Sequence, residues 1–201
     1  MVMEPLYNPI VKRVFTEEES KEILEFLKEK AYVYHTPYKR YNKMVKVPRG
    51  QASFTLNDNI HYNYGRIAGG SPPNEVMCDR LKEITQRVNM VMGRNYNTIL
   101  MNVFKNNKDC FAGHQDNENG WVKGTGFGTL AFGCPRPFRI CEIATKNTET
   151  IIHKPGGMIE LHYPMNSFFT HQVPPYSTGS QALADEWRIS LTFREREESI
   201  P

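Results

Sequence analysis

Short apolar or alternating runs, separated by glycine, proline and asparagine, fill the C-terminal half of the chain and constrain its fold most strongly. Each run is long enough for a β-strand and too short for a helix. The runs span residues 98–104, 127–132, 138–143, 150–153, 158–163, 169–173 and 187–193. This succession of strands predicts a β-sandwich or jelly roll at the heart of the domain.

Two helices are predicted before these strands. Thr16 and Glu19 have the spacing of a capping box, and apolar residues follow at helical spacing, so a first helix is expected over residues 17–30. A second amphipathic helix is expected from about residue 73 to residue 93. The stretch between them, residues 32–72, is interpreted as hairpins and loops on one edge of the core. The expected fold class is therefore α+β.

Composition limits the class of protein. The 201 residues suit one domain, and 39% hydrophobic with 23% charged residues excludes wholesale disorder. No apolar run is long enough to span a membrane, and the N-terminus lacks the apolar core of a secretory signal. We therefore expect an intracellular protein, cytoplasmic or nuclear depending on the host. The net charge of +3 neither requires nor excludes nucleic acid as a partner.

Two histidines and an aspartate form the pattern that most clearly suggests chemistry. His114 and Asp116 are two residues apart, so on an extended segment both side chains leave the same face. His171, in a later strand, is well placed to supply a third ligand. Two imidazoles and one carboxylate form the facial triad of non-haem Fe(II) oxygenases. The His-x-Asp spacing alone is weak evidence, because it also arises by chance and a lone histidine is more often a core residue.

The last predicted strand strengthens this interpretation. Arg188 and Arg194 share one face of it with Ser190 and Thr192, while apolar residues occupy the other face. Two arginines that point into a barrel are unfavourable unless each meets a carboxylate. A dicarboxylate co-substrate such as 2-oxoglutarate supplies both carboxylates. The alternative is a strand whose charged face points to solvent.

These residues belong to segments that resemble the AlkB family of Fe(II)/2-oxoglutarate dioxygenases, most closely its vertebrate-type homologues that repair alkylated nucleic acid bases. The resemblance covers roughly residues 47–194. The matching segments are VPRGQA from Val47, HYNYGRI from His61, LMNVF from Leu100, HQDNE from His114, LAFG from Leu130, GMI from Gly157, HQVP from His171 and RISLTFR from Arg188. Together these segments are specific, although His-x-Asp alone is not.

The resemblance implies a double-stranded β-helix, or jelly roll, in which His114, Asp116 and His171 ligate Fe(II). It also implies that Arg188 pairs with the distal carboxylate of 2-oxoglutarate. Arg194 is then expected beside the carboxylate next to the keto group, with O2 as the remaining co-reactant.

Three further positions are implied to contact 2-oxoglutarate. Asn102 matches an asparagine that hydrogen-bonds the co-substrate. Phe104 stands where the family usually has tyrosine, and Ser190 where it usually has asparagine. Each departure removes or shortens a polar contact, so weaker co-substrate binding is expected, without loss of binding.

The resemblance also implies substrate-binding positions. Glu118 matches an acid that relatives use at the exocyclic amino group of a damaged base, although it also suits a solvated loop. Tyr62, Tyr64 and Arg66 fall in the region of a nucleotide-recognition flap, where an aromatic ring can stack on a flipped base. At least one of these tyrosines is expected to be core. A set of basic residues there is interpreted as a phosphate-binding surface: Lys39, Arg40, Lys43, Lys46, Arg49 and Arg66.

The sequence thus predicts one dioxygenase domain over residues 1–201, with helices and flap in 1–96 and the jelly-roll core in 97–194. The expected activity is oxidative demethylation of 1-methyladenine- or 3-methylcytosine-type bases in DNA or RNA, releasing formaldehyde, succinate and CO2. Two alternatives stay open: a hydroxylase of this class acting on a protein side chain, small molecule or intact nucleobase methyl group, and a non-catalytic nucleic-acid-binding module. Alkylated DNA or RNA is the expected partner of a monomer, with no membrane and no protein partner.

Overall fold

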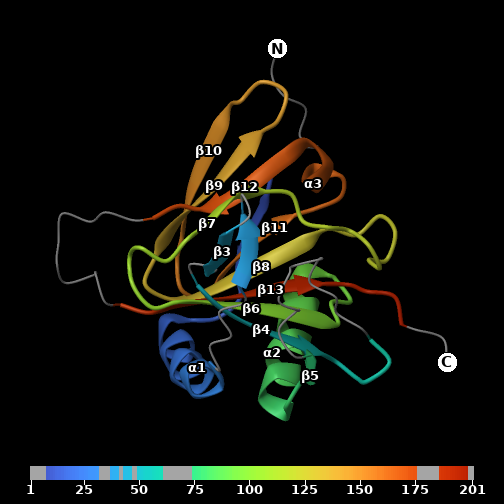
Figure 1. The fold of residues 1–201 in the computed structure, drawn as a ribbon. Coiled ribbons are helices and arrows are strands. Elements are labelled where there is room, and N and C mark those ends of the chain that lie inside the picture. Colours follow the sequence, from blue (N-terminus) through green and yellow to red (C-terminus); the bar gives the residue numbers. More distant parts are fainter. Residues whose placement is uncertain are drawn as a thin grey trace.

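The computed structural model describes residues 8–31, 37–40, 43–46, 49–60, 74–175 and 186–198, which form two large sheets, a separate hairpin and three helices (Figure 1). The helices are α1 (Glu17–Lys30), α2 (Asp79–Met92) and α3 (Met165–Phe168). The strands are β1 (Ile10–Arg13), β2 (Pro37–Arg40), β3 (Lys43–Lys46), β4 (Gly50–Thr55), β5 (Asn74–Val76), β6 (Thr98–Phe104), β7 (Phe111–His114), β8 (Phe127–Gly133), β9 (Arg136–Glu142), β10 (Thr148–His153), β11 (Gly157–Leu161), β12 (Phe169–Val173) and β13 (Arg188–Arg194).

The two large sheets face each other as a jelly roll. The seven-stranded sheet has the order β1-β11-β8-β13-β6-β4-β5, and the four-stranded sheet has the order β10-β9-β12-β7. Within the large sheet β13 is central and pairs antiparallel with both β6 and β8. Strands β2 and β3 form the separate hairpin. This arrangement confirms the α+β class and the jelly-roll core predicted from the sequence.

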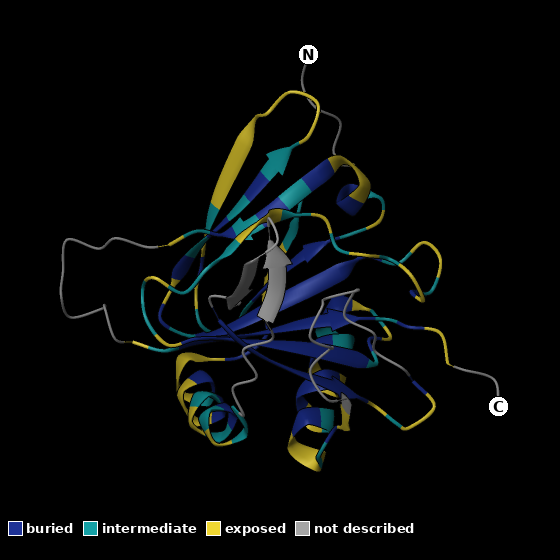
Figure 2. Ribbon diagram, viewed as in Figure 1, coloured by how far each residue is buried: buried dark blue, intermediate teal, exposed yellow. Residues whose placement is uncertain are grey.

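Two apolar clusters hold the layers together. One lies between the seven-stranded sheet and helices α1 and α2, with Leu27, Val88 and Leu191 fully buried. The other lies between the two sheets and includes Phe104 and Phe138. Figure 2 shows the same division, because the central strands are buried and the exposed residues of α1 and α2 lie on their outer sides. Strands β6 and β13, which carry the candidate co-substrate residues, are therefore packed on both faces.

Helix α1 has the bounds predicted from the sequence. The Thr16 side chain accepts a hydrogen bond from the backbone N–H of Glu19, and the Glu19 side chain accepts one from the backbone N–H of Thr16. This capping box satisfies two otherwise unpaired donors. The first helix is thus specified by local chemistry, which explains why its limits could be predicted.

Helix α2 begins later than the predicted start near residue 73. Asn74–Val76 instead forms β5, which pairs in parallel with β4, and Cys78 is the N-cap of the helix. The predicted end at Gly93 is confirmed, since this residue adopts φ +66° and its N–H bonds the carbonyl of Asn89. A left-handed residue at this position favours glycine.

The predicted strand runs coincide with observed strands to within two residues at each end. The interpretation of residues 32–72 as hairpins and loops on an edge is correct for β2–β3 but wrong for β4. Strand β4 is buried along its whole length and lies between β5 and β6 in the large sheet. Strands β1 and β7 were also not predicted, because they are largely exposed and owe their conformation to distant partners, β11 and β12.

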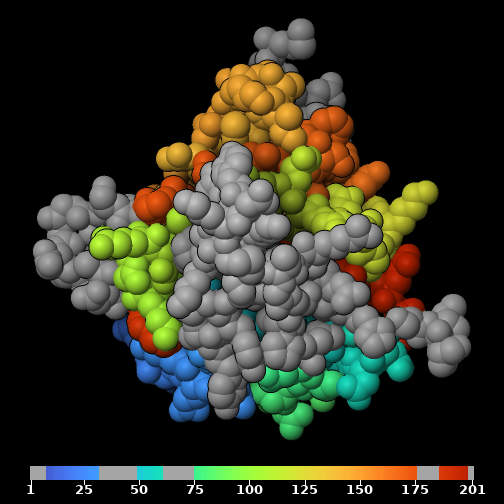
Figure 3. Space-filling model, in the orientation of Figure 1, coloured from blue at the N-terminus to red at the C-terminus, as the bar shows by residue number. Residues whose placement is uncertain are grey.

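The outer shape follows from this layering. In the space-filling view, the β9–β10 hairpin protrudes at the end opposite α1 and α2 (Figure 3). In the part of the chain that the structure describes, no helix combines the length and apolar character needed to cross a membrane.

Candidate metal and co-substrate site

The three metal ligands predicted from the sequence lie together beside β7, the edge strand of the four-stranded sheet. His114 ends β7 and pairs in register with His171 of β12, and Asp116 follows two residues later. The Nε2 atoms of His114 and His171 lie 3.3 Å and 3.8 Å from Oδ1 of Asp116. One ligand atom from each residue lies within 4.8 Å of the other two. This donor set can hold one metal ion.

The protonation of these side chains suits metal binding. Nδ1 of His114 lies 2.9 Å from the carbonyl oxygen of Ala112 and donates to it, so Nε2 is the ring nitrogen that faces Asp116. Burial lowers the pKa of His171 to about 3, which keeps the imidazole neutral. Burial acts to raise the pKa of Asp116, but the opposing effects, led by the positive charge of Arg194, are larger, so the net shift is downward and the carboxylate stays ionised. Neutral imidazole and ionised carboxylate are the metal-binding forms.

Arg194, from the end of β13, binds the Asp116 carboxylate. Its Nε lies 3.1 Å from Oδ2, and its Nη2 donates to the same oxygen. The guanidinium carbon lies 5.6 Å from the Trp121 ring and 5.8 Å from the Phe127 ring. Because Oδ2 is engaged by arginine, Oδ1 is the oxygen that faces the imidazoles. A contact between Arg194 and 2-oxoglutarate stays a prediction.

Asn166, in α3, fixes the segment that carries Asp116. Its Oδ1 accepts from the backbone N–H of Asp116 at 2.9 Å, and its Nδ2 donates to the carbonyl of Asp116 at 2.9 Å and to Oε1 of Glu118 at 2.8 Å. The side chain of Gln115 donates to the backbone carbonyl of Asn166 at 2.8 Å. One buried amide therefore orients both the metal-ligand candidate and the substrate-acid candidate. The sequence carries no signal for Asn166, since it lies 50 residues from Asp116.

The co-substrate positions lie on the paired strands β6 and β13. In this register Arg188 is opposite Phe104 and Ser190 is opposite Asn102, and all four residues are buried. The Oδ1 atom of Asn102 accepts from Nε of Arg49 at 2.8 Å and from Nε2 of Gln51 at 3.1 Å, which sets the orientation of its amide. The predicted face of β13 therefore points into the protein and not to solvent.

Arg188 is a buried cation, and only some of its hydrogen-bond donors are used within the described residues. It is 1% exposed, and its Nε and Nη1 atoms have no hydrogen-bond partner among the described residues. Its Nη2 lies 3.2 Å from Nδ1 of His153, and its guanidinium carbon lies 5.0 Å from the Phe104 ring. Burial and the nearby Arg136 lower the pKa of Arg188 to about 9. No carboxylate in the described ranges pairs with it, so the position suits the carboxylate of a ligand.

Arg49 departs from its expected place. It was predicted to hold phosphate on a surface, but it is 7% exposed, and its guanidinium lies 5.2 Å from the Phe111 ring. The surface prediction is wrong because Arg49 begins the buried segment that leads into β4. It lines one pocket together with Leu100, Asn102, Phe111, His114, Asp116, His171, Thr192 and Arg194.

The remaining predicted substrate residues are only partly covered by the structure. Glu118 is half-buried and is hydrogen-bonded to Asn166. Tyr62, Tyr64 and Arg66 lie outside the described residues, as do the side chains of the β2–β3 hairpin that carries the predicted basic surface. Their roles stay predictions.

Comparison with known proteins gives one family match and several relatives. The model of the 2OG-Fe(II) oxygenase superfamily matches residues 9–194. The DNA oxidative demethylase ALKBH2 of Bos taurus is 24% identical over 194 residues, covering 90% of this chain and 66% of the relative. The proteins of that name from Homo sapiens and Mus musculus are 23% and 25% identical, covering 90% and 77% of this chain and 70% and 64% of their own lengths. The chain thus spans about two thirds of these relatives.

Solved structures support the fold. OsALKBH1 aligns with a TM-score of 0.64 at 13% identity, over 97% of this chain and 100% of that chain. A prolyl-4-hydroxylase from Pseudomonas putida aligns with a TM-score of 0.52 at 12% identity, over 95% of this chain and 94% of that chain. Similarity to the ALKBH2 proteins supports the resemblance to the AlkB family. Because the superfamily match covers nearly the whole chain, this chain belongs to the 2OG-Fe(II) oxygenase superfamily.

Proposed function

We propose that this protein is an Fe(II)/2-oxoglutarate-dependent oxidative demethylase of N-alkylated bases in DNA or RNA. The products are the restored base, formaldehyde, succinate and CO2. The observation that carries the proposal is the His114–Asp116–His171 cluster, whose ligand atoms lie within 4.8 Å of one another. It lies beside β13, which carries Arg188 and Arg194, and Arg194 binds Asp116. The ALKBH2 relatives, named as DNA oxidative demethylases, support a nucleic acid substrate.

The residues present fit the groups that the family implies. Two imidazoles and one carboxylate are a donor set typical of non-haem Fe(II). The Nε and Nη1 atoms of buried Arg188, which have no partner in the described ranges, fit the distal carboxylate of 2-oxoglutarate. When bound, Fe(II), 2-oxoglutarate and O2 supply the oxidising chemistry that hydroxylates an alkyl carbon on nitrogen.

The chain itself orients these groups and keeps water away. Arg194 holds Asp116 ionised and turns Oδ1 toward the imidazoles. The rings of Phe127 and Phe138 pack against His171, with ring centroids 4.8 Å and 5.8 Å away. This apolar shell fixes the imidazole plane and lowers the local polarity, which strengthens every electrostatic contact in the pocket.

Glu118 is the proposed contact to the substrate base. A carboxylate is a suitable acceptor for an exocyclic amino group. Asn166 donates to Oε1 of Glu118 and leaves Oε2 for the base. The target base has to be single-stranded or extruded, because an alkylated Watson–Crick nitrogen is inaccessible in the stack. Lesions that already break pairing reduce the free energy of extrusion.

The test is formaldehyde release from oligonucleotides that carry 1-methyladenine or 3-methylcytosine, in single- and double-stranded DNA and in RNA, with Fe(II), 2-oxoglutarate and air. We expect formaldehyde and succinate in equal amounts. Asp116→Ala is expected to abolish both products. Asp79→Ala removes an exposed carboxylate at the start of α2 and is expected to leave turnover unchanged.

The same assay distinguishes the alternatives. Succinate formation without formaldehyde, stimulated by a peptide or a small molecule, indicates a hydroxylase of another substrate. Wild-type protein that binds metal but consumes no 2-oxoglutarate under any of these conditions contradicts the proposed function.

A further inference from the structure

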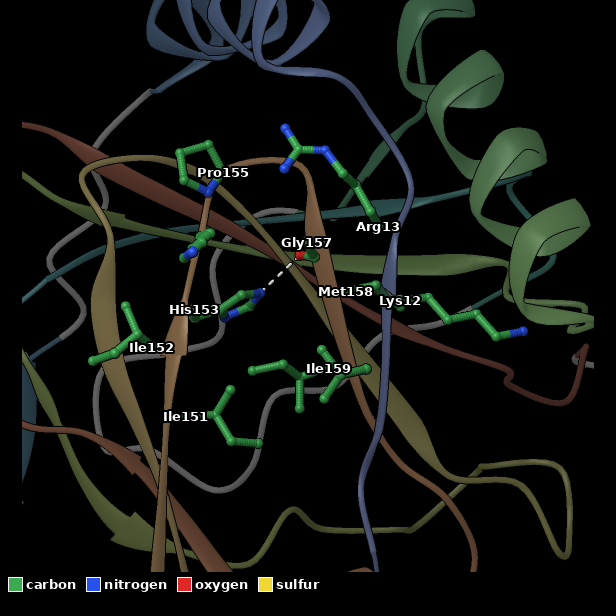
Figure 4. A pocket seen from close by; sticks show the side chains of 11 residues that line it. Lys12, Arg13, Ile151, Ile152, His153, Pro155, Gly157, Met158 and Ile159 are labelled. Atoms are coloured by element: carbon green, nitrogen blue, oxygen red, sulfur yellow. Dashed lines mark hydrogen bonds between the residues drawn. The ribbon is translucent and has the colours of Figure 1, made fainter.

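His153 ends β10 and reaches across the space between the two sheets to Arg188. It is 2% exposed, and its Nδ1 lies 3.2 Å from Nη2 of Arg188 in β13. Its Nε2 lies 2.8 Å from the carbonyl oxygen of Gly157, as the dashed line in Figure 4 shows. The Phe138 ring meets the imidazole edge-on, with centroids 6.0 Å apart. The imidazole plane is therefore held from three sides.

The two polar contacts determine where the His153 ring carries its proton. A guanidinium only donates hydrogen bonds, and a backbone carbonyl only accepts them. Nδ1 is therefore the unprotonated acceptor and Nε2 carries the hydrogen. Burial and the positive charge of Arg188 lower the pKa of His153 to about 3, so the ring is neutral near pH 7.

His153 is the one hydrogen-bond partner of the Arg188 side chain in the described part of the protein. Nη2 carries two N–H groups, and His153 accepts only one of them. The second N–H of Nη2 stays available beside a neighbouring nitrogen, which is the fork that binds a carboxylate through two parallel hydrogen bonds. His153 thus holds the guanidinium without occupying its binding fork.

Among the described residues that line the cavity beside His153, no other side chain can take its place. A cavity of about 190 Å³ between β1, β10 and β11 adjoins the ring (Figure 4). Beside His153, its lining side chains are aliphatic, basic or proline: Val11, Lys12, Arg13, Ile151, Ile152, Lys154, Pro155, Met158 and Ile159, with Gly157 adding backbone alone. None of these side chains is a hydrogen-bond acceptor suited to an arginine.

We propose that His153 is a positioning residue for Arg188, accepting one hydrogen bond from Nη2 so that the other N–H groups stay directed at the distal carboxylate of 2-oxoglutarate. The inference rests on the proposed function, which assigns that carboxylate to Arg188. It adds a residue that the sequence did not indicate, because the contact joins β10 and β13 across 35 residues.

The test compares two variants of nearly equal shape in the Mn(II)-loaded protein. In His153→Asn the amide oxygen can replace Nδ1 as the acceptor, whereas His153→Leu has no acceptor. Calorimetry measures the dissociation constants of 2-oxoglutarate and of 2-oxobutyrate, which lacks the distal carboxylate. We expect His153→Leu to bind 2-oxoglutarate about tenfold more weakly and His153→Asn to stay within about threefold of the wild type. Binding of 2-oxobutyrate is expected to be equal in all three proteins.

The other possible outcomes contradict either the positioning role of His153 or the proposed function of the protein. Equal affinity of the two variants for 2-oxoglutarate, or a parallel loss for 2-oxobutyrate, overturns the positioning role and leaves the proposed function intact. Wild-type protein that binds no 2-oxoglutarate overturns the proposed function itself. Nitrogen NMR of the wild-type imidazole adds a test that does not depend on variant folding, because a protonated Nδ1 on His153 also overturns the inference.

Discussion

At the residue scale, the two departures from the AlkB pattern, Phe104 and Ser190, are expected to weaken the binding of 2-oxoglutarate. The Phe104 ring is fully buried, and its centroid lies 5.0 Å from the guanidinium carbon of Arg188. We expect Phe104→Tyr to bind 2-oxoglutarate about two- to tenfold more tightly, because a neutral hydrogen bond contributes about 0.5–1.5 kcal/mol. Calorimetry of the Mn(II)-loaded protein measures this change. An unchanged dissociation constant, with unchanged thermal stability, would contradict the prediction.

Arg188 is expected to have opposite effects on 2-oxoglutarate binding and on the stability of the folded protein. In the ligand-free protein it is a buried cation without a carboxylate partner in the described ranges, and such a charge is unfavourable. We expect Arg188→Met to raise the free energy of unfolding by about 1 kcal/mol or more and to weaken 2-oxoglutarate binding about 30-fold or more. Urea denaturation without ligand and calorimetry with 2-oxoglutarate measure the two effects.

A matched substitution at a paired arginine is the control. Arg94 binds the buried carboxylate of Glu160, which also accepts from the Tyr96 hydroxyl at 3.0 Å. We expect Arg94→Met to lower the free energy of unfolding by about 2 kcal/mol or more, because it leaves that carboxylate short of a partner. If Arg188→Met lowers the free energy of unfolding as much as Arg94→Met does, the interpretation of Arg188 as a residue that binds a ligand carboxylate is contradicted.

At the element scale, the short helix α3 controls the segment that follows β7. Asn166 makes three hydrogen bonds to Asp116 and Glu118, and all three are 2.9 Å or shorter. We expect Asn166→Ala to weaken Mn(II) binding about tenfold, because Asp116 loses its fixed orientation. Metal titration followed by calorimetry measures this. Asn117→Ala, which removes one exposed contact to the backbone of Asn119 in the same segment, is expected to bind Mn(II) normally.

The helices and strands also show which parts of the fold are determined by the local sequence. Helix α1 was predicted with its correct limits because its cap and its apolar stripe lie within fifteen adjacent residues. The start of α2 was missed because β5 pairs with β4, about twenty residues earlier in the chain. Pairing energy from a distant partner overrides local helix propensity, and no pattern within the segment reports it.

At the scale of the whole molecule, some residues of the candidate site could be predicted from the sequence and others could not. His114, Asp116, His171 and the two arginines were predicted because residue type, strand alternation and family resemblance agree on them. Asn166 and His153 were not predicted, because an amide or an imidazole acquires its role only when the fold brings it to a distant partner. The burial of Arg49 was likewise set by the sheet, since β4 lies inside it.

Burial of neutral histidine also makes the stability of the whole molecule depend on pH. The pKa of His153 falls to about 3 on folding, mainly through burial and then through Arg188, whereas an exposed histidine in the unfolded chain titrates near 6.5. Between these values the unfolded state binds a proton that the folded state excludes, so stability decreases as pH falls. His171 shifts in the same direction. Asp116, whose pKa is lowered in the folded state, affects stability only below about pH 4.5.

Between pH 6 and pH 4.5, a comparison of two proteins that differ only at residue 153 isolates the contribution of His153. We expect the free energy of unfolding of the metal-free wild-type protein to fall through this window. In His153→Asn the slope is expected to be shallower by about 1.4 kcal/mol per pH unit. The reason is that asparagine does not titrate, so the unfolded variant binds one proton fewer than the unfolded wild type. Urea denaturation at closely spaced pH values measures both slopes. Parallel curves for the two proteins would mean that His153 is charged in the folded state, which is incompatible with its hydrogen bond from Arg188.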